Sequence, residues 1–343
     1  MALATPSSAA VSPLGDRPLV SLLLATRDGS RFLPEALRSI EAQTYRPIEL
    51  IAVDDGSTDG TGALLGEFAA TRPWVRVLRA GGVGPAAARA LAFASSRGER
   101  IAIHDDDDVS APERLARQVA TLEARPAVGV LGSAALVIDA HGEVIGPYRV
   151  PVDPASIRRL LRRAPPFVHG SVMMRREAYE AAGGFRAPFR CAEDYDLWLR
   201  VPARFRFANL TEPLYRWRAH PGNSFARSRD RHLEFLAIAR AFDAERRARG
   251  TDSIGLLAAS ADLAAFRAAY HDAVRLARYR GEAFVRDGLA PEGRAALGPA
   301  FGSIATAPAA LAWWLLSWIF QLTPRGRRAR RRRKLASAAK AGS

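Results

Sequence analysis

The sequence contains a single cysteine, Cys191, among its 343 residues. One thiol cannot form a disulfide within the chain, and this agrees with a location in the reducing cytoplasm. The start of the chain also lacks a cationic segment followed by a sustained apolar run, because residues 1–18 are rich in Ala, Ser and Pro. This composition predicts a flexible leader and not a secretory signal.

Acidic residues are absent from Thr323 to Ser343, a stretch that holds nine Lys or Arg. The whole chain has a formal net charge of +15, so without these nine charges the rest is only mildly basic. A strongly basic body would favour nucleic acid as the partner. The concentration of charge in a tail argues against that interpretation.

An apolar stretch from Ile304 to Leu322 precedes the basic tail. Its length is close to what a bilayer span needs, but Thr306 and Pro308 interrupt it. Three tryptophans beside the basic run Arg325 to Lys334 favour a helix that lies on an anionic membrane surface. The alternative is a buried docking helix with a solvated tail. We expect peripheral association with the inner face of the cell membrane.

Short apolar runs alternate with segments of helical spacing through the first third of the chain. The pattern predicts strands at 19–25, 48–53, 75–78, 100–103 and 128–138, and helices at 32–42, 61–70, 85–96 and 112–124. Such alternation is typical of an α/β protein with a parallel, doubly wound sheet. Residues 231–288 show helical periodicity without convincing strands, and this predicts a helical extension.

Polar side chains follow three of the predicted strands: Thr26-Arg27-Asp28, Asp54-Asp55 and Asp105 to Asp108. Ligands of doubly wound sheets bind beyond the carboxyl ends of the strands. We therefore expect these three clusters to line one edge of the sheet together.

The run Asp105-Asp106-Asp107-Asp108 is the most informative feature of the sequence. Four consecutive acids repel one another, and a folded protein keeps them together when something positive relieves the field. Hard oxygen ligands at the end of a buried strand suit Mg²⁺ or Mn²⁺, which would also hold a diphosphate. A solvated acidic turn is the alternative, and the apolar strand directly before the run argues against it.

Several segments together resemble family 2 glycosyltransferases, over residues 19–225. The matching segments are VSLLLATRDG (20–29), LPEALRSIEAQTYRPIELIAVDDGSTDGT (33–61), GPAAARALAFA (84–94), ERIAIHDDDDVSAPERLARQ (99–118), GSVMMRREAYEAAGGF (170–185), AEDYDLWLR (192–200) and YRWRAHPGNS (215–224). The resemblance implies a GT-A fold, with a Rossmann-like, mostly parallel sheet and flanking helices. The implied organisation is a leader (1–18), a catalytic domain (19–230), a helical extension (231–303) and the apolar, basic tail (304–343).

The resemblance also implies which residues bind the nucleotide-sugar donor. Either Asp54 or Asp55 contacts the base and ribose; we favour Asp55, and the other acid caps the turn. The remaining donor-binding candidates are Ala25, through its backbone, Thr26, Arg89, Asp105 and Asp106. For Arg89 a surface salt bridge is the alternative.

The acidic run corresponds to the DXD motif of the family, with Asp105 and Asp107 at its first and last positions. This implies that Asp107 binds Mn²⁺ or Mg²⁺ directly, while Asp105 contacts the ribose or a water on the metal. His220 could be a further metal or diphosphate contact, although a lone histidine before Pro-Gly could equally be structural.

Glu193-Asp194 matches the acidic pair that supplies the general base, which must remove the proton of an acceptor hydroxyl. Because that role needs a carboxylate without a tight arginine partner, we assign it to Asp194 and give Glu193 a supporting role. The alternative for both acids is favourable placement at a helix N-terminus. His169 lies where related enzymes shape the acceptor site.

These features predict an inverting glycosyltransferase that moves a sugar, by default from a UDP-sugar, to a glycan or a lipid-linked glycan. One alternative is a metal-dependent nucleotidyltransferase, but the first strand is followed by Thr26-Arg27-Asp28-Gly29-Ser30 and not by a Gly-rich basic loop. The other alternative is a non-catalytic, membrane-associated scaffold with the same fold. Retention of both acidic motifs argues against it.

Overall fold

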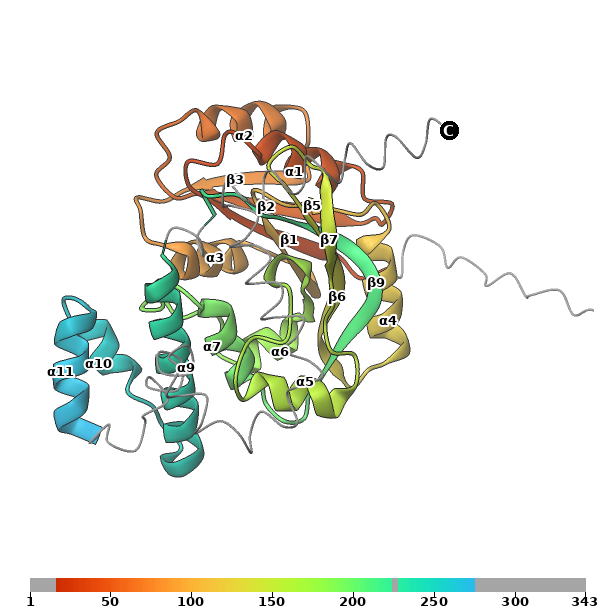
Figure 1. Cartoon of the computed structure of the whole chain (residues 1–343). Helices are drawn as coiled ribbons and strands as arrows, with labels where there is room; N and C mark the ends of the chain where they lie inside the picture. The colour runs from red at the N-terminus through yellow and green to blue at the C-terminus, as the bar shows by residue number, and fades with distance from the viewer. Residues whose placement is uncertain (1–16, 224–227, 275–343) are drawn as a thin grey trace, which may run out of the picture. The chain divides into compact units, whose positions relative to one another are not determined.

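The structure is a computed structural model, and it describes residues 17–223 and 228–274 (Figure 1). These residues belong to one compact unit. The predicted leader, apart from residues 17 and 18, and the apolar, basic segment 304–343 lie outside the described residues. None of the helices in the described ranges has the length and hydropathy to cross a membrane.

Residues 20–105 form the parallel part of the sheet, as predicted. Strands β1 (Val20–Thr26), β2 (Ile48–Asp54), β3 (Val75–Arg79) and β4 (Arg100–Asp105) lie in the order β3-β2-β1-β4, and each neighbouring pair is parallel. They alternate with α1 (Leu33–Glu41), α2 (Thr61–Ala70), α3 (Pro85–Ala94) and α4 (Arg114–Ala124). The observed bounds lie within two residues of the predicted ones.

Beyond β4 the sheet is mixed. It continues through β8 (Met173–Arg175), β6 (Val128–Ile138), β9 (Arg206–Arg218) and the short β5 (Val109–Ser110), while β7 (Val144–Tyr148) pairs with β6. Strands β6 and β7 are joined by only five residues, and a connection this short permits antiparallel pairing alone. Of these strands the sequence pattern had predicted only β6.

Helices cover both faces of the sheet, and successive residues of a strand contribute to the hydrophobic cores on opposite faces. In β1, Leu22 and Leu24 belong to the core on the side of α1, α2 and α4, whereas Leu23 belongs to the core that includes α3 residues. All three side chains are fully buried. Burial on both faces explains why the strand is an almost continuous apolar run.

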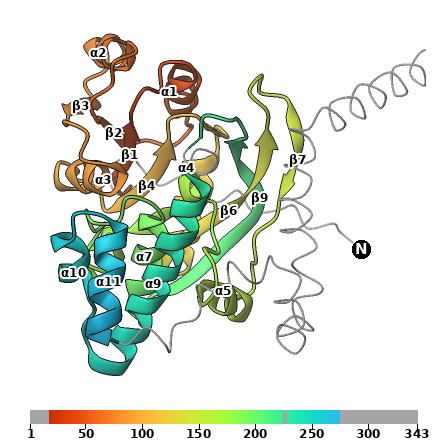
Figure 2. The same cartoon turned by 60° about the vertical axis from the view of Figure 1, so that its left-hand side comes forward.

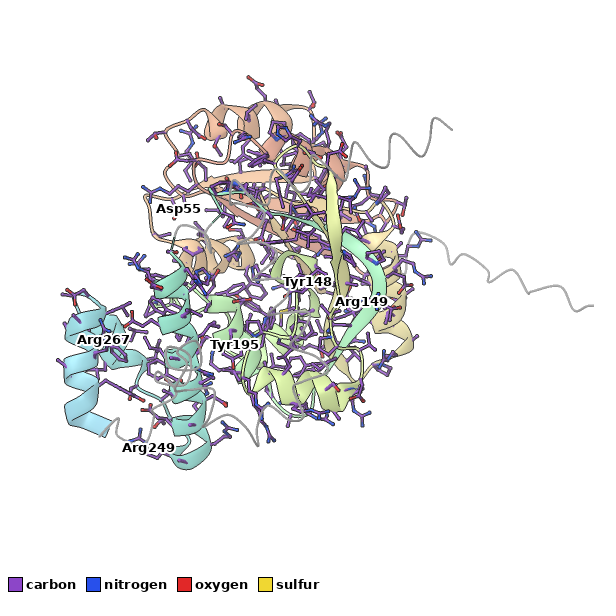
Figure 3. All side chains as sticks on the ribbon, viewed as in Figure 1. Asp55, Tyr148, Arg149, Tyr195, Arg249 and Arg267 are labelled. Atoms are coloured by element: carbon purple, nitrogen blue, oxygen red, sulfur yellow. The ribbon has the colours of Figure 1, made fainter. Side chains whose placement is uncertain are left out.

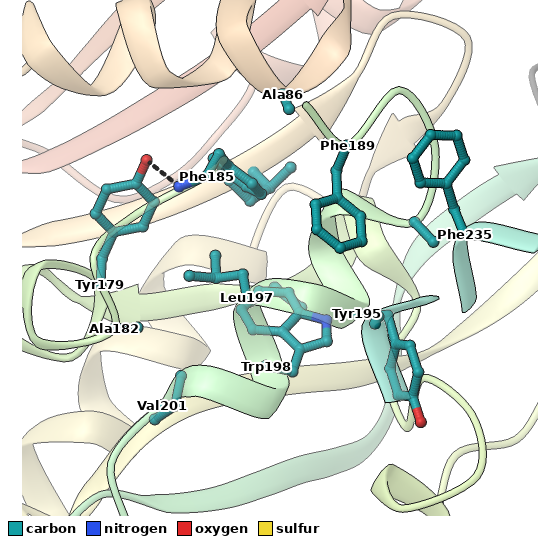
Figure 4. Close-up of a cluster of buried hydrophobic side chains, with 14 of the residues drawn as sticks. Ala86, Tyr179, Ala182, Phe185, Phe189, Tyr195, Leu197, Trp198, Val201 and Phe235 are labelled. Carbon is teal, nitrogen blue, oxygen red and sulfur yellow. Dashed lines mark hydrogen bonds between the residues drawn. The ribbon is translucent and has the colours of Figure 1, made fainter. Parts of the chain in front are cut away.

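The remaining helices are α5 (Pro154–Leu161), the short 3₁₀ turn η2 (His169–Ser171), α6 (Arg176–Ala181), α7 (Glu193–Arg200), α9 (Arg229–Arg249), α10 (Ile254–Ala259) and α11 (Leu263–Val274). Each of these α-helices contributes residues to the core that includes α3 residues, and Figure 2 shows α7, α9, α10 and α11 close together. Helix α9 packs on α7, and its residues Phe235 and Phe242 share one hydrophobic core with Trp198 of α7. Figure 4 shows Phe235 and Trp198 in this core. The described part of the helical extension is thus built into the core of the sheet domain.

Candidate active site

The register of the parallel strands brings the predicted polar clusters to one edge. Thr26 pairs with Asp54 across β1 and β2, and Ala25 pairs with Asp105 across β1 and β4. All four residues stand at the carboxyl ends of their strands. This is the edge at which ligands of such sheets bind.

Asp54 and Asp55 have different partners. The Asp54 carboxylate accepts a hydrogen bond of 2.9 Å from the backbone N–H of Ser57 and so closes the turn after β2. The Asp55 carboxylate accepts bonds of 2.7 and 2.8 Å from the backbone N–H groups of Val83 and Gly84, and Figure 3 shows Asp55 beside the loop that leads into α3. Because a carboxylate offers about four acceptor positions, Asp55 keeps capacity for a ligand.

The four consecutive acids do not all face the same way. Asp108 is only 1% exposed and accepts a 2.7 Å hydrogen bond from the backbone N–H of Arg218. Asp105, Asp106 and Asp107 are half-buried, and the Thr26 hydroxyl donates to Asp106. Asp108 therefore points inward, and only the first three acids of the run keep exposed surface.

The acidic cluster holds more negative charge than its surroundings offset. Burial, and after it the charge of Asp107, raises the pKa of Asp106 to about 7. The same two causes raise the pKa of Asp108 well above its usual range. A divalent cation beside these carboxylates would relieve this field.

Asp107 is oriented by His220, whose Nε2 lies 2.9 Å from Asp107 Oδ2. The backbone N–H of Gly222 donates a hydrogen bond of 3.2 Å to His220 Nδ1, so Nδ1 is an acceptor. The ring proton is therefore on Nε2, which donates the hydrogen bond to Asp107. Within residues 17–223 and 228–274, no three His, Cys, Asp or Glu side chains come together as a metal site. The half-buried carboxylates of Asp105 and Asp107 are oxygen donors of the kind that suits a cation of the Mg²⁺ class, which one or two carboxylates and substrate phosphates commonly hold.

Arg89 joins the acidic cluster to the acidic pair of α7. Its Nη2 lies 2.8 Å from Asp105 Oδ1, and its Nη1 lies 2.5 Å from Glu193 Oε1. Arg89 is 7% exposed, so it is not part of a surface salt bridge. Although burial works against the charge, the carboxylates of Glu193 and Asp105 raise the pKa of Arg89. One buried guanidinium thus ties two segments 88 positions apart, the end of β4 and the start of α7.

Asp194 has a different neighbour from Glu193. His169 Nδ1 lies 3.6 Å from Asp194 Oδ2, and burial, with Arg89 nearby, lowers the pKa of His169 so that its ring is neutral. Neither ring nitrogen of His169 has a hydrogen-bond partner among the described residues. Burial raises the pKa of both Glu193 and Asp194. The two acids differ in their partners, because Arg89 pairs with Glu193 and no arginine pairs with Asp194 among the described contacts.

Backbone constraints hold the residues around the acidic pair. A Cβ atom on Gly170 would stand 2.0 Å from Tyr215 Oη and 2.9 Å from Asp105 Oδ2, so glycine is required there. Ala192, directly before the pair, has a left-handed backbone with φ of 53°. That conformation costs an L-residue about 1–2 kcal/mol, and such strain concentrates at functional sites.

Two residues that organise the site were missed by sequence reasoning. Tyr215 of β9 accepts a 3.1 Å hydrogen bond from the backbone N–H of Asp105. Arg218, 1% exposed, donates to the Asp107 carbonyl at 2.7 Å and to Glu35 at 2.6 Å. Both belong to the segment 215–224 that matched the family pattern, and that match was the only signal that could have found them.

The chain is similar to known proteins over most of the described region. The model "Glycosyl transferase family 2" matches residues 21–183. EpsE of Bacillus subtilis, named as a glycosyltransferase, is 37% identical over 206 residues, which cover 59% of this chain and 73% of EpsE.

Two solved structures have the same fold. TarS of S. aureus, in complex with UDP-GlcNAc, gives a TM-score of 0.54 at 18% identity and covers 66% of either chain. The mannosyltransferase PcManGT of Pyrobaculum calidifontis, in complex with GDP-Man and Mn²⁺, gives 0.52 at 21% identity, over 90% of this chain and 86% of PcManGT. At these identities the likeness establishes the fold alone.

Proposed function

Because the chain belongs to glycosyl transferase family 2 and is a glycosyltransferase of GT-A fold, we propose that it transfers a sugar with inversion from a nucleotide-sugar donor to an acceptor hydroxyl. The observation that carries this proposal is the Arg89 bridge, which holds Asp105 within the same site as Glu193 and Asp194. This bridge supports assigning donor binding and the general base to one site. Membership of the family also sets aside the nucleotidyltransferase and scaffold alternatives.

The donor side of the site consists of strand ends. Asp55, beside the loop into α3, suits the base and ribose, and Ala25 and Thr26 of β1 lie next to the acidic cluster. We favour a UDP-sugar as the donor. The complexes of TarS with UDP-GlcNAc and of PcManGT with GDP-Man support a nucleotide-sugar in general and leave the nucleotide open.

Asp107 would hold a Mn²⁺ or Mg²⁺ ion, with Asp105 near the ribose or a water on the metal. The ion would supply positive charge for the donor diphosphate. His220 keeps Asp107 in one orientation through its Nε2–H, as outer partners of metal ligands commonly do. The Mn²⁺ complex of PcManGT supports a divalent metal for this fold.

Asp194 acts as the general base in this proposal. It takes the proton of the acceptor hydroxyl while that oxygen bonds to C1 of the donor sugar. The bond from C1 to the diphosphate oxygen breaks, and its electron pair leaves with the nucleoside diphosphate. Attack from the face opposite the leaving group inverts C1, through the oxocarbenium-like character that glycosyl transfer shares with glycoside hydrolysis.

Glu193 supports this step indirectly, because its charge is matched by Arg89. We assign His169, whose Nδ1 lies 3.6 Å from Asp194 Oδ2, to the acceptor side of the site. We propose a glycan or lipid-linked glycan as the acceptor. The basic stretch 325–334 supports peripheral binding to the inner, anionic face of the cell membrane.

The test is nucleoside diphosphate release by the full-length chain from UDP-, dTDP- and GDP-sugars, without acceptor. We expect release from one nucleotide class, dependent on Mn²⁺ or Mg²⁺ and abolished by EDTA. Asp107→Ala should abolish metal-dependent binding of the same donor, whereas Asp153→Asn, at a remote helix cap, should not. Release that is indifferent to metal, or normal donor binding by Asp107→Ala, would contradict the metal assignment.

A further inference from the structure

A buried ion network connects the start of α7 to the C-terminal helices. Arg186 is its centre: Nε lies 2.9 Å from Asp196 Oδ2, and Nη1 lies 2.8 and 3.0 Å from the two oxygens of Asp252. The side chains of Asp196 and Asp252 are 0% and 4% exposed. A planar guanidinium with several fixed donors can hold two carboxylates in one geometry. Arg186 therefore fixes the distance between the elements that carry them.

On the catalytic side, the network holds the first turn of α7. Asp196 stands two residues after Asp194 in this turn, and its carboxylate also accepts bonds of 2.9 and 3.1 Å from Arg200. Its backbone N–H donates to the Ala192 carbonyl at 3.1 Å. Asp196 is thus anchored by its side chain and its backbone together, and its position sets that of the acidic pair before it.

On the other side, the network ends in the segment between α9 and α10. Asp252 also binds Arg246 of α9 and accepts a 3.1 Å bond from the backbone N–H of Ile254. Glu245 of α9 accepts a 2.8 Å bond from the backbone N–H of Ser253. These bonds hold Asp252 in a fixed position between α9 and α10.

The other end of α9 lies near the segment that leads into the acidic pair. Helix α9 packs on α7, and burial lowers the pKa of His232, in the first turns of α9, while the charge of Asp194 works against this shift. Nearby, Cys191 Sγ lies 3.9 Å from Ser228 Oγ, directly before α9. The start of α9 therefore lies beside Cys191, which precedes the acidic pair. The segment after α9 is linked to the first turn of α7 through Arg186.

The backbone before the acidic pair needs such support. Ala192 is left-handed, a conformation that an alanine leaves readily unless its surroundings hold it. It is 2% exposed and is followed directly by Glu193 and Asp194. If this turn relaxed, both carboxylates would move relative to the strand ends that face them.

We propose that α9 and α10 are a positioning element of the active site, in which Asp252, acting through Arg186 on Asp196, holds the strained turn that carries Glu193 and Asp194. Asp252 and Arg186 are positioning residues and touch no reacting atom. The proposal rests on the base role given to Asp194. It assigns a catalytic purpose to a segment beyond residue 183, where the family match ends.

The first test is Asp252→Asn in the full-length chain, with Asp262→Asn as the matched control. Asp262 is exposed and accepts a 2.8 Å hydrogen bond from the backbone N–H of Ala265, a cap that asparagine also provides, and it has no bond to Arg186 or Arg246 among the described contacts. We expect Asp252→Asn to lower kcat for nucleoside diphosphate release from the donor about 10- to 100-fold. This is the effect of a small misplacement of a catalytic group. The Kd for UDP with Mn²⁺ should stay within about twofold, because the strand ends are untouched. Equal losses in the two variants, or an unchanged kcat, would overturn the proposal.

A second variant separates positioning from general destabilisation. Glycine adopts the left-handed conformation at no steric cost, so Ala192→Gly should reduce the need for the network. We expect Ala192→Gly in the Asp252→Asn background to restore at least half of the lost kcat. If the melting temperature recovers without kcat, Asp252 is merely structural and the proposal fails.

Hydrogen exchange provides a readout that does not depend on activity. In Asp252→Asn the amides of 193–198 should exchange faster than in the wild type, while those of β1 and β4 should not change. Should Asp252→Asn not fold, Arg186→Lys, which keeps the charge but loses the fork, takes its place with the same expectations. If the wild type releases no sugar from any donor, the proposed function fails, but unchanged exchange in 193–198 is what refutes the positioning element.

Discussion

The two sides of the active site are held by different kinds of bonds. On the donor side, Thr26, Asp54 and Asp105 are placed by the ladder of parallel strands, whose backbone hydrogen bonds fix the register. On the base side, Glu193 and Asp194 are placed by side-chain ion pairs with Arg89 and, through Asp196, with Arg186. A ladder tolerates the loss of one side chain, whereas an ion pair does not. Single substitutions should therefore separate donor binding from sugar transfer.

The largest effect is expected on the base side. Asp194→Asn removes the proton acceptor, so kcat for transfer should fall about 10²- to 10⁴-fold, the range that general base catalysis contributes. Donor affinity, measured by titration with UDP and Mn²⁺, should stay unchanged because Asp55 and Asp107 are intact. Asp153→Asn serves as control, because asparagine caps α5 as well as aspartate does. Normal transfer by Asp194→Asn would show that the base is another residue.

Arg89 contacts both the donor side and the base side, so its loss should impair donor binding and sugar transfer together. Arg89→Met would leave the buried Glu193 and the half-buried Asp105 without their cation, and removal of one partner of a buried pair costs about 3–5 kcal/mol. Chemical denaturation should show this loss, and both donor binding and kcat should fall. Arg117→Met, which removes an exposed ion pair with Glu212, should leave the stability nearly unchanged. A stable Arg89→Met with normal kcat would mean that the bridge is dispensable.

The donor side should respond more weakly when a supporting residue is changed. His220→Gln loosens Asp107 without removing it, so the affinity for Mn²⁺ in the presence of UDP should fall about 10- to 100-fold. The kcat at saturating metal should be nearly normal. His141→Gln, an exposed histidine in the turn after β6, is the control. An unchanged metal affinity in His220→Gln would remove His220 from the donor side.

The smallest effect concerns pH. Because burial raises the pKa of Asp194, this carboxylate takes up a proton at a higher pH than a free aspartate. A base must be deprotonated, so kcat/KM should decline on the acid side at a higher pH than an ordinary carboxyl group would give. The residual activity of Asp194→Asn should lack this decline. A wild-type profile with the decline at the usual aspartate pKa would contradict the burial of the base.

The parallel half of the fold was predictable because its determinants are local. The apolar runs of β1, β2 and β4 are buried on both faces, and helical spacing identified α1 to α4. The mixed half was not, apart from β6. Strand β9 contains Arg206, Thr211 and Arg216 on exposed positions and a proline, so its pattern resembles a loop until β6 and β5 pair with it.

The candidate residues were predictable to a similar degree. Their positions after strands and at the start of α7 follow from the motif segments. The separate roles of residues within one motif were not predictable, because the four identical acids of the run Asp105 to Asp108 cannot be told apart from their neighbours in the sequence. Tyr215 and Arg218, which shape this run, lie more than a hundred positions away along the chain.

The sequence by itself determined that acidic side chains would stand at the carboxyl ends of parallel strands, because apolar periodicity and β-α-β order are properties of neighbouring residues. Only the tertiary structure decided that the Asp108 side chain turns inward and that Arg89 pairs with Glu193 and not with Asp194. It also decided that Arg186 links the segment between α9 and α10 to α7. Each of these depends on a charge or hydrogen bond between distant segments, and such pairs form only once the chain has packed.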